Sequence, residues 1–282
     1  MNNLGFHCHQ LDILEEITVG NGLGRSEFYN LPSDELPRLK QLIERHRLEW
    51  SIHTPLIQLD WYPQPPTLSF LCDVDRDNRE LTMKMITLTM EQAEEFGAEY
   101  VVAHLPSPAS DASGESVAKL EDIARRSCER LAELSLKKNV PIHIEGVGAS
   151  HLINAEFISA VLEEFSPLRY CFDSAHSYLA ALDNGFDLYD FETELLPYLG
   201  SVHLWNIRGW EDYLAFRHIP IHPSQRAEDG WIDIARVLRA LGPGKSSLPI
   251  IFESERSYPE ELGGYDYREG VEWAKKLLET SS

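Results

Sequence analysis

Short apolar runs alternate along the chain with longer amphipathic stretches. Apolar runs of about four to eight residues, with polar residues at alternate positions or none, are typical of strands, whereas apolar residues at every third or fourth position are typical of helices. The pattern predicts strands at residues 4–9, 48–53, 100–104, 140–145, 168–173, 201–205, 217–222 and 249–253.

Amphipathic stretches separate most of these strands and predict helices. Ser33 is expected to be the N-cap of the first helix, and Gly97 is expected to end the second. Residues 21–31 show no regular pattern, and the helix after the strand at 201–205 is expected to be short or absent. The predicted helices cover residues 34–46, 75–96, 115–138, 155–165, 232–241 and 267–278.

Repeated alternation of strands and helices predicts an α/β fold with parallel strands and helices on the outside. The count of eight strands favours a closed (β/α)8 barrel over an open, doubly wound sheet. The chain has no Ser- or Gly-rich linker and no short repeat. We therefore expect a single barrel domain over residues 1–282.

Polar side chains end most of the predicted strands. Side chains alternate along a strand, so Ile142 and Ile144 face one way while His143 and Glu145 face the other. If the apolar set packs against the helices, the polar set points into the barrel, where the carboxyl ends of the strands converge and active sites form. The strand-end residues are His53, His104, Glu145, Asp173, His203 and Glu253.

Taken singly, these residues have ordinary structural roles: a strand-end His is often only hydrogen-bonded, and Asp173 can cap the next helix. Together they would bring several carboxylates into the mouth of the barrel, where the dielectric constant is low. Repulsion and desolvation make this costly unless a cation compensates. Mixed His and carboxylate ligands suit zinc or manganese. The sequence therefore predicts a divalent-metal site.

Six short motifs, taken in order, resemble the xylose-isomerase-like TIM barrel superfamily, which includes sugar isomerases, sugar epimerases and endonuclease IV. The resemblance runs from about residue 48 to residue 253. It implies that Glu145, Asp173, His203 and Glu253 hold one metal ion, as in the ketose 3-epimerases, and that Glu145 and Glu253 are the paired acid/base residues. The motifs are Ser51-Ile52-His53-Thr54-Pro55, His104-Leu105-Pro106, Ile144-Glu145-Gly146, Phe172-Asp173-Ser174-Ala175-His176, Val202-His203-Leu204 and Phe252-Glu253.

The endonuclease IV branch implies further ligands. His53 and His104 match residues that join the fourth-strand Glu in holding another metal there. His176 matches a ligand of a third metal, or a substrate contact in the epimerases. The Asp-Arg-His triplet of that branch reads Phe216-Arg217-His218 here, without the carboxylate. Alternation places His222 on the same face as His218, so either one is a candidate site histidine.

Two chemistries fit this set of residues. The first is a metal-dependent isomerase or epimerase that converts a small sugar or polyol-type carbonyl substrate through an enediolate. Its candidate substrate-binding residues are His176, Trp205, Arg208 and His222; Arg208 resembles an epimerase arginine, at a spacing one residue shorter. The second is metal-assisted phosphoester hydrolysis, as in endonuclease IV. A barrel that binds a metal or ligand without catalysis is a third alternative.

The charge of the chain bears on the choice of partner. There are 25 Lys and Arg against 46 Asp and Glu, a formal net charge of −21, which argues against a nucleic-acid partner. The sequence shows no apolar run that could span a bilayer and no signal-peptide pattern at its start. The four cysteines form no CxxC pair, as expected in a reducing cytoplasm. We expect a cytoplasmic protein with a small-molecule, carbohydrate substrate; homo-oligomerisation stays open.

Overall fold

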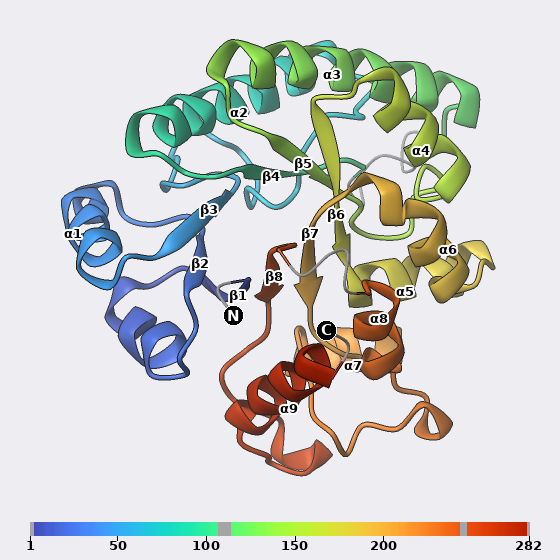
Figure 1. The fold of residues 1–282 in the computed structure, drawn as a ribbon. Coiled ribbons are helices and arrows are strands. Elements are labelled where there is room, and N and C mark those ends of the chain that lie inside the picture. The colour runs from blue at the N-terminus through green and yellow to red at the C-terminus, as the bar shows by residue number, and fades with distance from the viewer. Residues whose placement is uncertain (1–2, 107–113, 243–246, 281–282) are drawn as a thin grey trace.

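Eight parallel strands close into a barrel in the computed structural model, which describes residues 3–106, 114–242 and 247–280 (Figure 1). Each strand pairs with the next along the chain, and the last pairs with the first. The predicted (β/α)8 architecture is confirmed. The strands are β1 (Leu4–Cys8), β2 (Arg25–Phe28), β3 (Glu49–His53), β4 (Val101–His104), β5 (Ile142–Glu145), β6 (Leu168–Asp173), β7 (Leu199–Leu204) and β8 (Ile250–Phe252).

Helices surround the barrel (Figure 1). They are α1 (Leu36–His46), α2 (Arg76–Phe96), α3 (Val117–Lys138), α4 (Ala155–Glu164), α5 (Ser174–Asn184), α6 (Leu188–Leu195), α7 (Trp210–Phe216), α8 (Ile234–Ala240) and α9 (Tyr267–Thr280). Shorter helical turns are η1 (Leu11–Ile13), η2 (Glu15–Val19), η3 (Ser33–Glu35), η5 (Leu196–Tyr198), η6 (Ala227–Asp229) and η8 (Glu260–Leu262).

Local sequence signals set several helix ends. The Asp75 and Asn154 side chains accept backbone N–H groups in the first turns of α2 and α4. Gly97 ends α2 in the left-handed conformation, with φ 78°, as predicted. The prediction for Ser33 was wrong. It belongs to η3, and α1 begins at Leu36 with no side-chain cap.

One predicted strand was wrong and one strand was missed, so the count of eight still held. Residues 217–222 form no strand; Ile219 makes only an isolated antiparallel bridge with Asn206. The missing strand is β2, inside the stretch that was expected to be irregular. Its Arg25 and Glu27 face the barrel interior, so it lacks the apolar run that marks the other strands.

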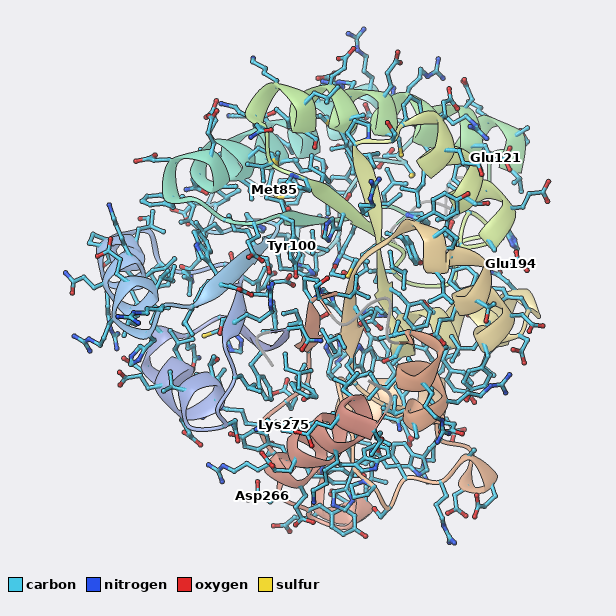
Figure 2. The ribbon with its side chains drawn as sticks, in the orientation of Figure 1. Met85, Tyr100, Glu121, Glu194, Asp266 and Lys275 are labelled. Atoms are coloured by element: carbon cyan, nitrogen blue, oxygen red, sulfur yellow. The ribbon has the colours of Figure 1, made fainter. Side chains whose placement is uncertain are left out.

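The two faces of the barrel wall have different surroundings. Outward residues such as Ile142 and Ile144 belong to the main hydrophobic core, together with residues of the helices. Inside the barrel, Val102 and Cys171 form a small separate cluster with Tyr100, which is labelled in Figure 2. Apolar packing therefore stabilises mainly the outside of the wall, and polar groups occupy much of the inside.

Two glycines make room for polar side chains within the barrel. A Cβ on Gly5 would lie 2.4 Å from Arg25 Cγ, and one on Gly200 would lie 2.5 Å from His143 Nε2. Arg25 contacts Glu49 at 2.6 Å and so carries a compensating charge near the amino end of β2. His143 Nδ1 lies 2.9 Å from Ser201 Oγ. The absence of a side chain at each glycine permits this packing.

The outer surface carries much of the acidic charge. Glu194 on α6 and Asp266 before α9 are exposed and project away from the barrel (Figure 2). None of the described helices combines the length and the apolar character that a transmembrane segment requires.

Candidate metal centre and active site

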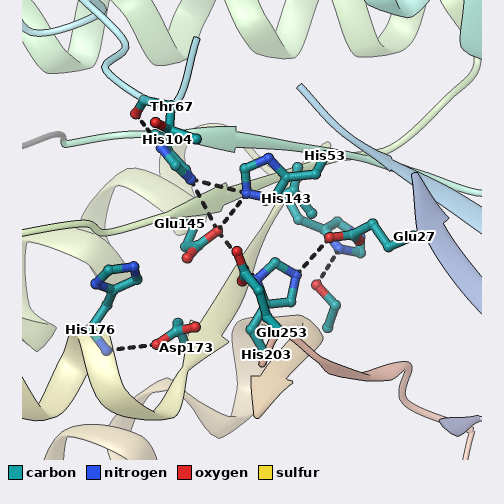
Figure 3. Close-up of polar contacts among 12 residues, drawn as sticks. Glu27, His53, Thr67, His104, His143, Glu145, Asp173, His176, His203 and Glu253 are labelled. Atoms are coloured by element: carbon teal, nitrogen blue, oxygen red, sulfur yellow. Dashed lines mark hydrogen bonds and ion pairs between the residues drawn. The ribbon is translucent and has the colours of Figure 1, made fainter. Parts of the chain in front are cut away.

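The carboxyl ends of the strands bring the predicted His, Asp and Glu residues together (Figure 3). Because these residues share the inward face of their strands, their side chains converge in the barrel mouth. All of them are buried, from 0% exposed for His203 to 8% for Glu253. The converging residues are His53 on β3, His104 on β4, Glu145 on β5, Asp173 on β6, His203 on β7, and Glu253 directly after β8.

His203 lies between two carboxylates. Its Nδ1 is 2.6 Å from Glu253 Oε2 and 3.4 Å from Glu145 Oε2. Burial opposes ionisation of Glu145, but His203 and His104 beside it keep its pKa well below the usual value. Glu145 and Glu253 therefore present negative charge to a common point next to one imidazole nitrogen.

A pair of histidines faces Glu145 from the other side. The Nε2 atoms of His53 and His104 are 3.1 Å apart, and each is 3.5 Å from Glu145 Oε2. His104 Nδ1 lies 2.6 Å from the carbonyl oxygen of Thr67, which can only accept a hydrogen bond. In the neutral ring, the lone pair of His104 is then on Nε2 and points at the cluster. Metal-binding histidines typically have such a carbonyl partner.

Asp173 has two roles. Its Oδ1 accepts the backbone N–H groups of Ala175 and His176, so it is the N-cap of α5, while Trp205 Nε1 donates to Oδ2 at 2.7 Å. The same turn brings the His176 side chain beside Asp173 and Glu145. Burial lowers the pKa of His176 to about 3, so its ring is neutral and offers a lone pair.

The donor set fits a divalent cation. Ligand atoms of His53, Glu145, His203 and Glu253 lie within 4.8 Å of one another, as do those of Glu145, Asp173 and His176. Both Glu145 oxygens, Glu253 Oε2 and His203 Nδ1 are buried and make no hydrogen bond in the described part of the chain. Burial and then the charge of Glu145 raise the pKa of Asp173 well above the usual value. A cation would satisfy these atoms and balance the charge.

A cavity of about 450 Å³ opens beside the cluster, and Glu253 forms part of its wall. Its other lining residues include His7 on β1, Tyr29 directly after β2, and His218. Burial lowers the pKa of His7 to about 4. A volume of this size suits a small molecule.

The other predicted site residues are spread more widely. The ring of His218 stacks on Trp205 with a centroid separation of 4.1 Å, next to His176. His222 is not brought to the cluster: it stacks on Tyr265 at 4.0 Å, and its Nε2 lies 3.2 Å from Glu269 on α9.

Arg208 is also held elsewhere by its neighbours. Its guanidinium group makes two hydrogen bonds to Asp212, at 2.7 and 2.8 Å, and lies over the ring of Trp231. This pairing directs two of the five guanidinium N–H groups at Asp212 and not at the cluster.

Sequence reasoning missed Glu27. It lies on β2, is fully buried, and its Oε1 is 2.9 Å from His203 Nε2. The signal available was a two-residue spacing: Arg25 and Glu27 share one face of Arg25–Phe28, as expected for inward residues of a polar barrel. Without a recognised strand there was no reason to place Glu27 in the barrel.

The chain belongs to the xylose isomerase-like TIM barrel family, because the model of that family matches residues 3–277. A comparison with curated protein sequences gives no significant match.

Solved structures share the fold over the whole chain. A D-tagatose 3-epimerase-like protein superposes with a TM-score of 0.74 at 18% identity, over 99% of this chain and 98% of the other. An L-ribulose 3-epimerase superposes with a TM-score of 0.72 at 18% identity, over 100% of this chain and 96% of the other. A Thermus thermophilus protein from a crystal soaked with ZnCl2 superposes with a TM-score of 0.64 at 19% identity, over 99% of both chains. At these identities the likeness establishes the fold.

Proposed function

We propose that this protein is a divalent-metal-dependent isomerase or epimerase that acts on a small sugar through an enediolate. One observation carries the proposal: Glu145 and Glu253 converge on His203 Nδ1, and Glu253 forms part of the wall of a cavity large enough for a small molecule. Membership of the xylose isomerase-like family and the names of the structural neighbours, D-tagatose and L-ribulose 3-epimerases, support a ketose substrate.

Glu145, Asp173, His203 and Glu253 would hold the ion, and zinc and manganese are the candidates because the donors are oxygen and imidazole nitrogen. When bound, the ion supplies positive charge to the substrate oxygens and stabilises the enediolate. His203 and Asp173 are fixed by neighbouring groups and serve as ligands only.

The two glutamates would divide the proton transfer. One carboxylate removes the proton from the carbon next to the carbonyl group, and the electron pair of that C–H bond moves toward the carbonyl oxygen. The other carboxylate returns a proton to the opposite face, which inverts the carbon. Glu145 and Glu253 come from β5 and from the end of β8, so they can approach a bound substrate from two directions. His176, Trp205 and His218 form an aromatic group beside them, and the half-buried His218, which lines the cavity, would contact the sugar.

The test is exchange of a substrate proton with solvent. We expect the manganese- or zinc-loaded protein to incorporate deuterium at C3 of D-tagatose or L-ribulose in D2O, followed by NMR. Loss of a general acid/base group typically costs about 10²–10⁴-fold. Glu253→Gln and Glu145→Gln should therefore abolish measurable exchange, whereas Glu194→Gln on the outer surface should not alter it. Absence of exchange with a panel of ketoses by metal-loaded protein would contradict the proposal.

Metal-assisted phosphoester hydrolysis is a second candidate, favoured by one observation. His53 and His104 both approach Glu145 Oε2, as two additional ligands of a second ion would. The discriminating assay is hydrolysis of bis-p-nitrophenyl phosphate by protein loaded with zinc or manganese. Turnover that is lost in His53→Ala and His104→Ala, with no deuterium exchange into ketoses, would favour hydrolysis. If the metal-loaded protein were inactive in both assays, binding of a metal or ligand without catalysis would be the remaining alternative.

A further inference from the structure

Glu27 is a buried carboxylate that belongs to none of the predicted ligand sets. It is 0% exposed and reaches His203 from β2, on the side of the ring opposite Glu145 and Glu253 (Figure 3). Its Oε1 lies 2.9 Å from His203 Nε2. Its Oε2 accepts a hydrogen bond of 2.9 Å from Ser51 Oγ on β3. Both oxygens of Glu27 therefore have a polar neighbour, and the carboxylate has a defined direction.

The two nitrogens of His203 face different partners. Nε2 faces Glu27, whereas Nδ1 faces Glu253 at 2.6 Å and Glu145 at 3.4 Å. An ionised carboxylate only accepts hydrogen bonds, so Glu27 favours the proton on Nε2. By the same rule, Glu253 at 2.6 Å favours a proton on Nδ1 while no ion is bound. A cation held by Glu253 and Glu145 would take the place of that proton, and Glu27 would keep the other proton on Nε2, so that the Nδ1 lone pair is available to the ion. An ion bound at Nδ1 lies on the far edge of the ring from Glu27, which cannot itself be a ligand there.

We infer that Glu27 is a positioning residue for the metal centre: it fixes the tautomer and the rotation of His203 so that Nδ1 is the ligand atom. This inference rests on the proposed metal-dependent function. A carboxylate behind a ligating imidazole also makes the imidazole a better donor, and loss of such a partner typically weakens metal binding about 10–100-fold. Ser51 holds the carboxylate in place from the neighbouring strand.

The chain offers a matched control. Glu192 on α6 is also fully buried, and among the described residues its side-chain oxygens have no hydrogen-bond partner and so no such link to the candidate metal centre. Glu27→Gln and Glu192→Gln each replace one buried carboxyl group by an amide of the same shape. A role of Glu27 in the fold alone would lower the melting temperature of the metal-free protein and leave the metal affinity of the folded protein unchanged.

The experiment measures the Kd for Zn²⁺ and Mn²⁺ by competition with a chelator, with the melting temperature of each metal-free variant. We expect Glu27→Gln to raise the Kd about 10–100-fold and Glu192→Gln to leave it unchanged. Ser51→Ala, which keeps the carboxylate but removes its hydrogen-bond donor, should raise the Kd by a smaller factor. If Glu27→Gln does not fold, the Kd of Ser51→Ala tests the inference in its place. Nitrogen-15 spectra of labelled histidine in the zinc-loaded protein should show His203 protonated at Nε2 in the wild type and a mixture of tautomers in Glu27→Gln.

The outcomes separate this inference from the proposed function. Wild-type binding that Glu27→Gln and Ser51→Ala leave unchanged would overturn the positioning role and leave the metal-dependent function standing. If Glu27→Gln does not fold, an unchanged Kd in Ser51→Ala has the same meaning. Absence of Zn²⁺ and Mn²⁺ binding by the wild type would overturn both.

Discussion

The indole nitrogen of Trp205 donates a hydrogen bond of 2.7 Å to Asp173 Oδ2, while the other oxygen of Asp173 caps α5. One candidate ligand is thus held from two directions, by the turn after β6 and by the residue that follows β7. Asp173 and His203 are also direct neighbours in the register of these strands. The wall of the barrel therefore positions this side of the candidate metal centre.

Replacing Trp205 should loosen Asp173. Trp205→Phe keeps an aromatic ring in the buried site but removes the donor to Oδ2, so we expect metal affinity to fall about tenfold. Trp210→Phe is the matched control, since the Trp210 indole also donates to a carboxylate, that of Asp183, on the outer surface. Equal metal affinities in the two variants, measured by chelator competition, would contradict the positioning of Asp173 by Trp205.

Asp173→Asn should separate capping from metal binding. Asn is as good an N-cap as Asp, so the helix start is retained, but its Nδ2 group then faces the Trp205 indole N–H and cannot accept that hydrogen bond. We expect the metal-free variant to be less stable than the wild type by about 1–3 kcal/mol, because the buried indole donor loses its acceptor, and its metal affinity to be reduced at least tenfold. Asp173→Ala also loses the cap and should be less stable than Asp173→Asn by about 1 kcal/mol. A stable Asp173→Asn with wild-type metal affinity would show that Asp173 is a cap only.

Glu192 should make stability depend on pH. Burial raises its pKa from 4.5 to about 8, and its oxygens have no hydrogen-bond partner in the described structure. The folded state therefore retains a proton that the unfolded state releases above pH 4.5. Between pH 4.5 and about 8, the free energy of unfolding of the wild type should fall relative to Glu192→Gln, by up to about 1.4 kcal/mol per pH unit.

The measurement for Glu192 is chemical unfolding of metal-free protein from pH 5 to pH 8. Glu194→Gln, an exposed residue of the same helix, is the control and should follow the wild type. Parallel pH profiles for the wild type and Glu192→Gln would show that Glu192 has an ordinary pKa.

The convergence of the strand-end residues could be predicted because it follows from two rules. Side chains alternate along a strand, and parallel strands in a barrel end on one face. Glu145 and His203 lie near the ends of largely apolar strands, so their strands and their direction could both be recognised in the sequence. The cap role of Asp173 was also foreseen, and the structure shows it acting beside the other acidic side chains.

What the sequence did not reveal has a physical cause. The polar barrel interior removes the apolar signal from β2, so Arg25–Phe28 does not look like a strand and Glu27 stays hidden. Residues 217–222 alternate Ile219 and Ile221 with polar positions, yet this stretch runs outside the sheet. Helix α5 begins directly after Asp173, and its first turn consists of small and polar residues. Only tertiary contacts distinguish these cases.

Metal content per chain tests the central claim most directly. We would measure it by elemental analysis in the wild type, Glu253→Ala, His53→Ala and His104→Ala, after reloading with zinc or manganese. Glu253 is a proposed ligand of the epimerase site, whereas the two histidines belong to the alternative second site. The account predicts one ion in the wild type, lost in Glu253→Ala and kept in both histidine variants. Two ions with one lost on removing either histidine, or no stoichiometric metal at all, would contradict it.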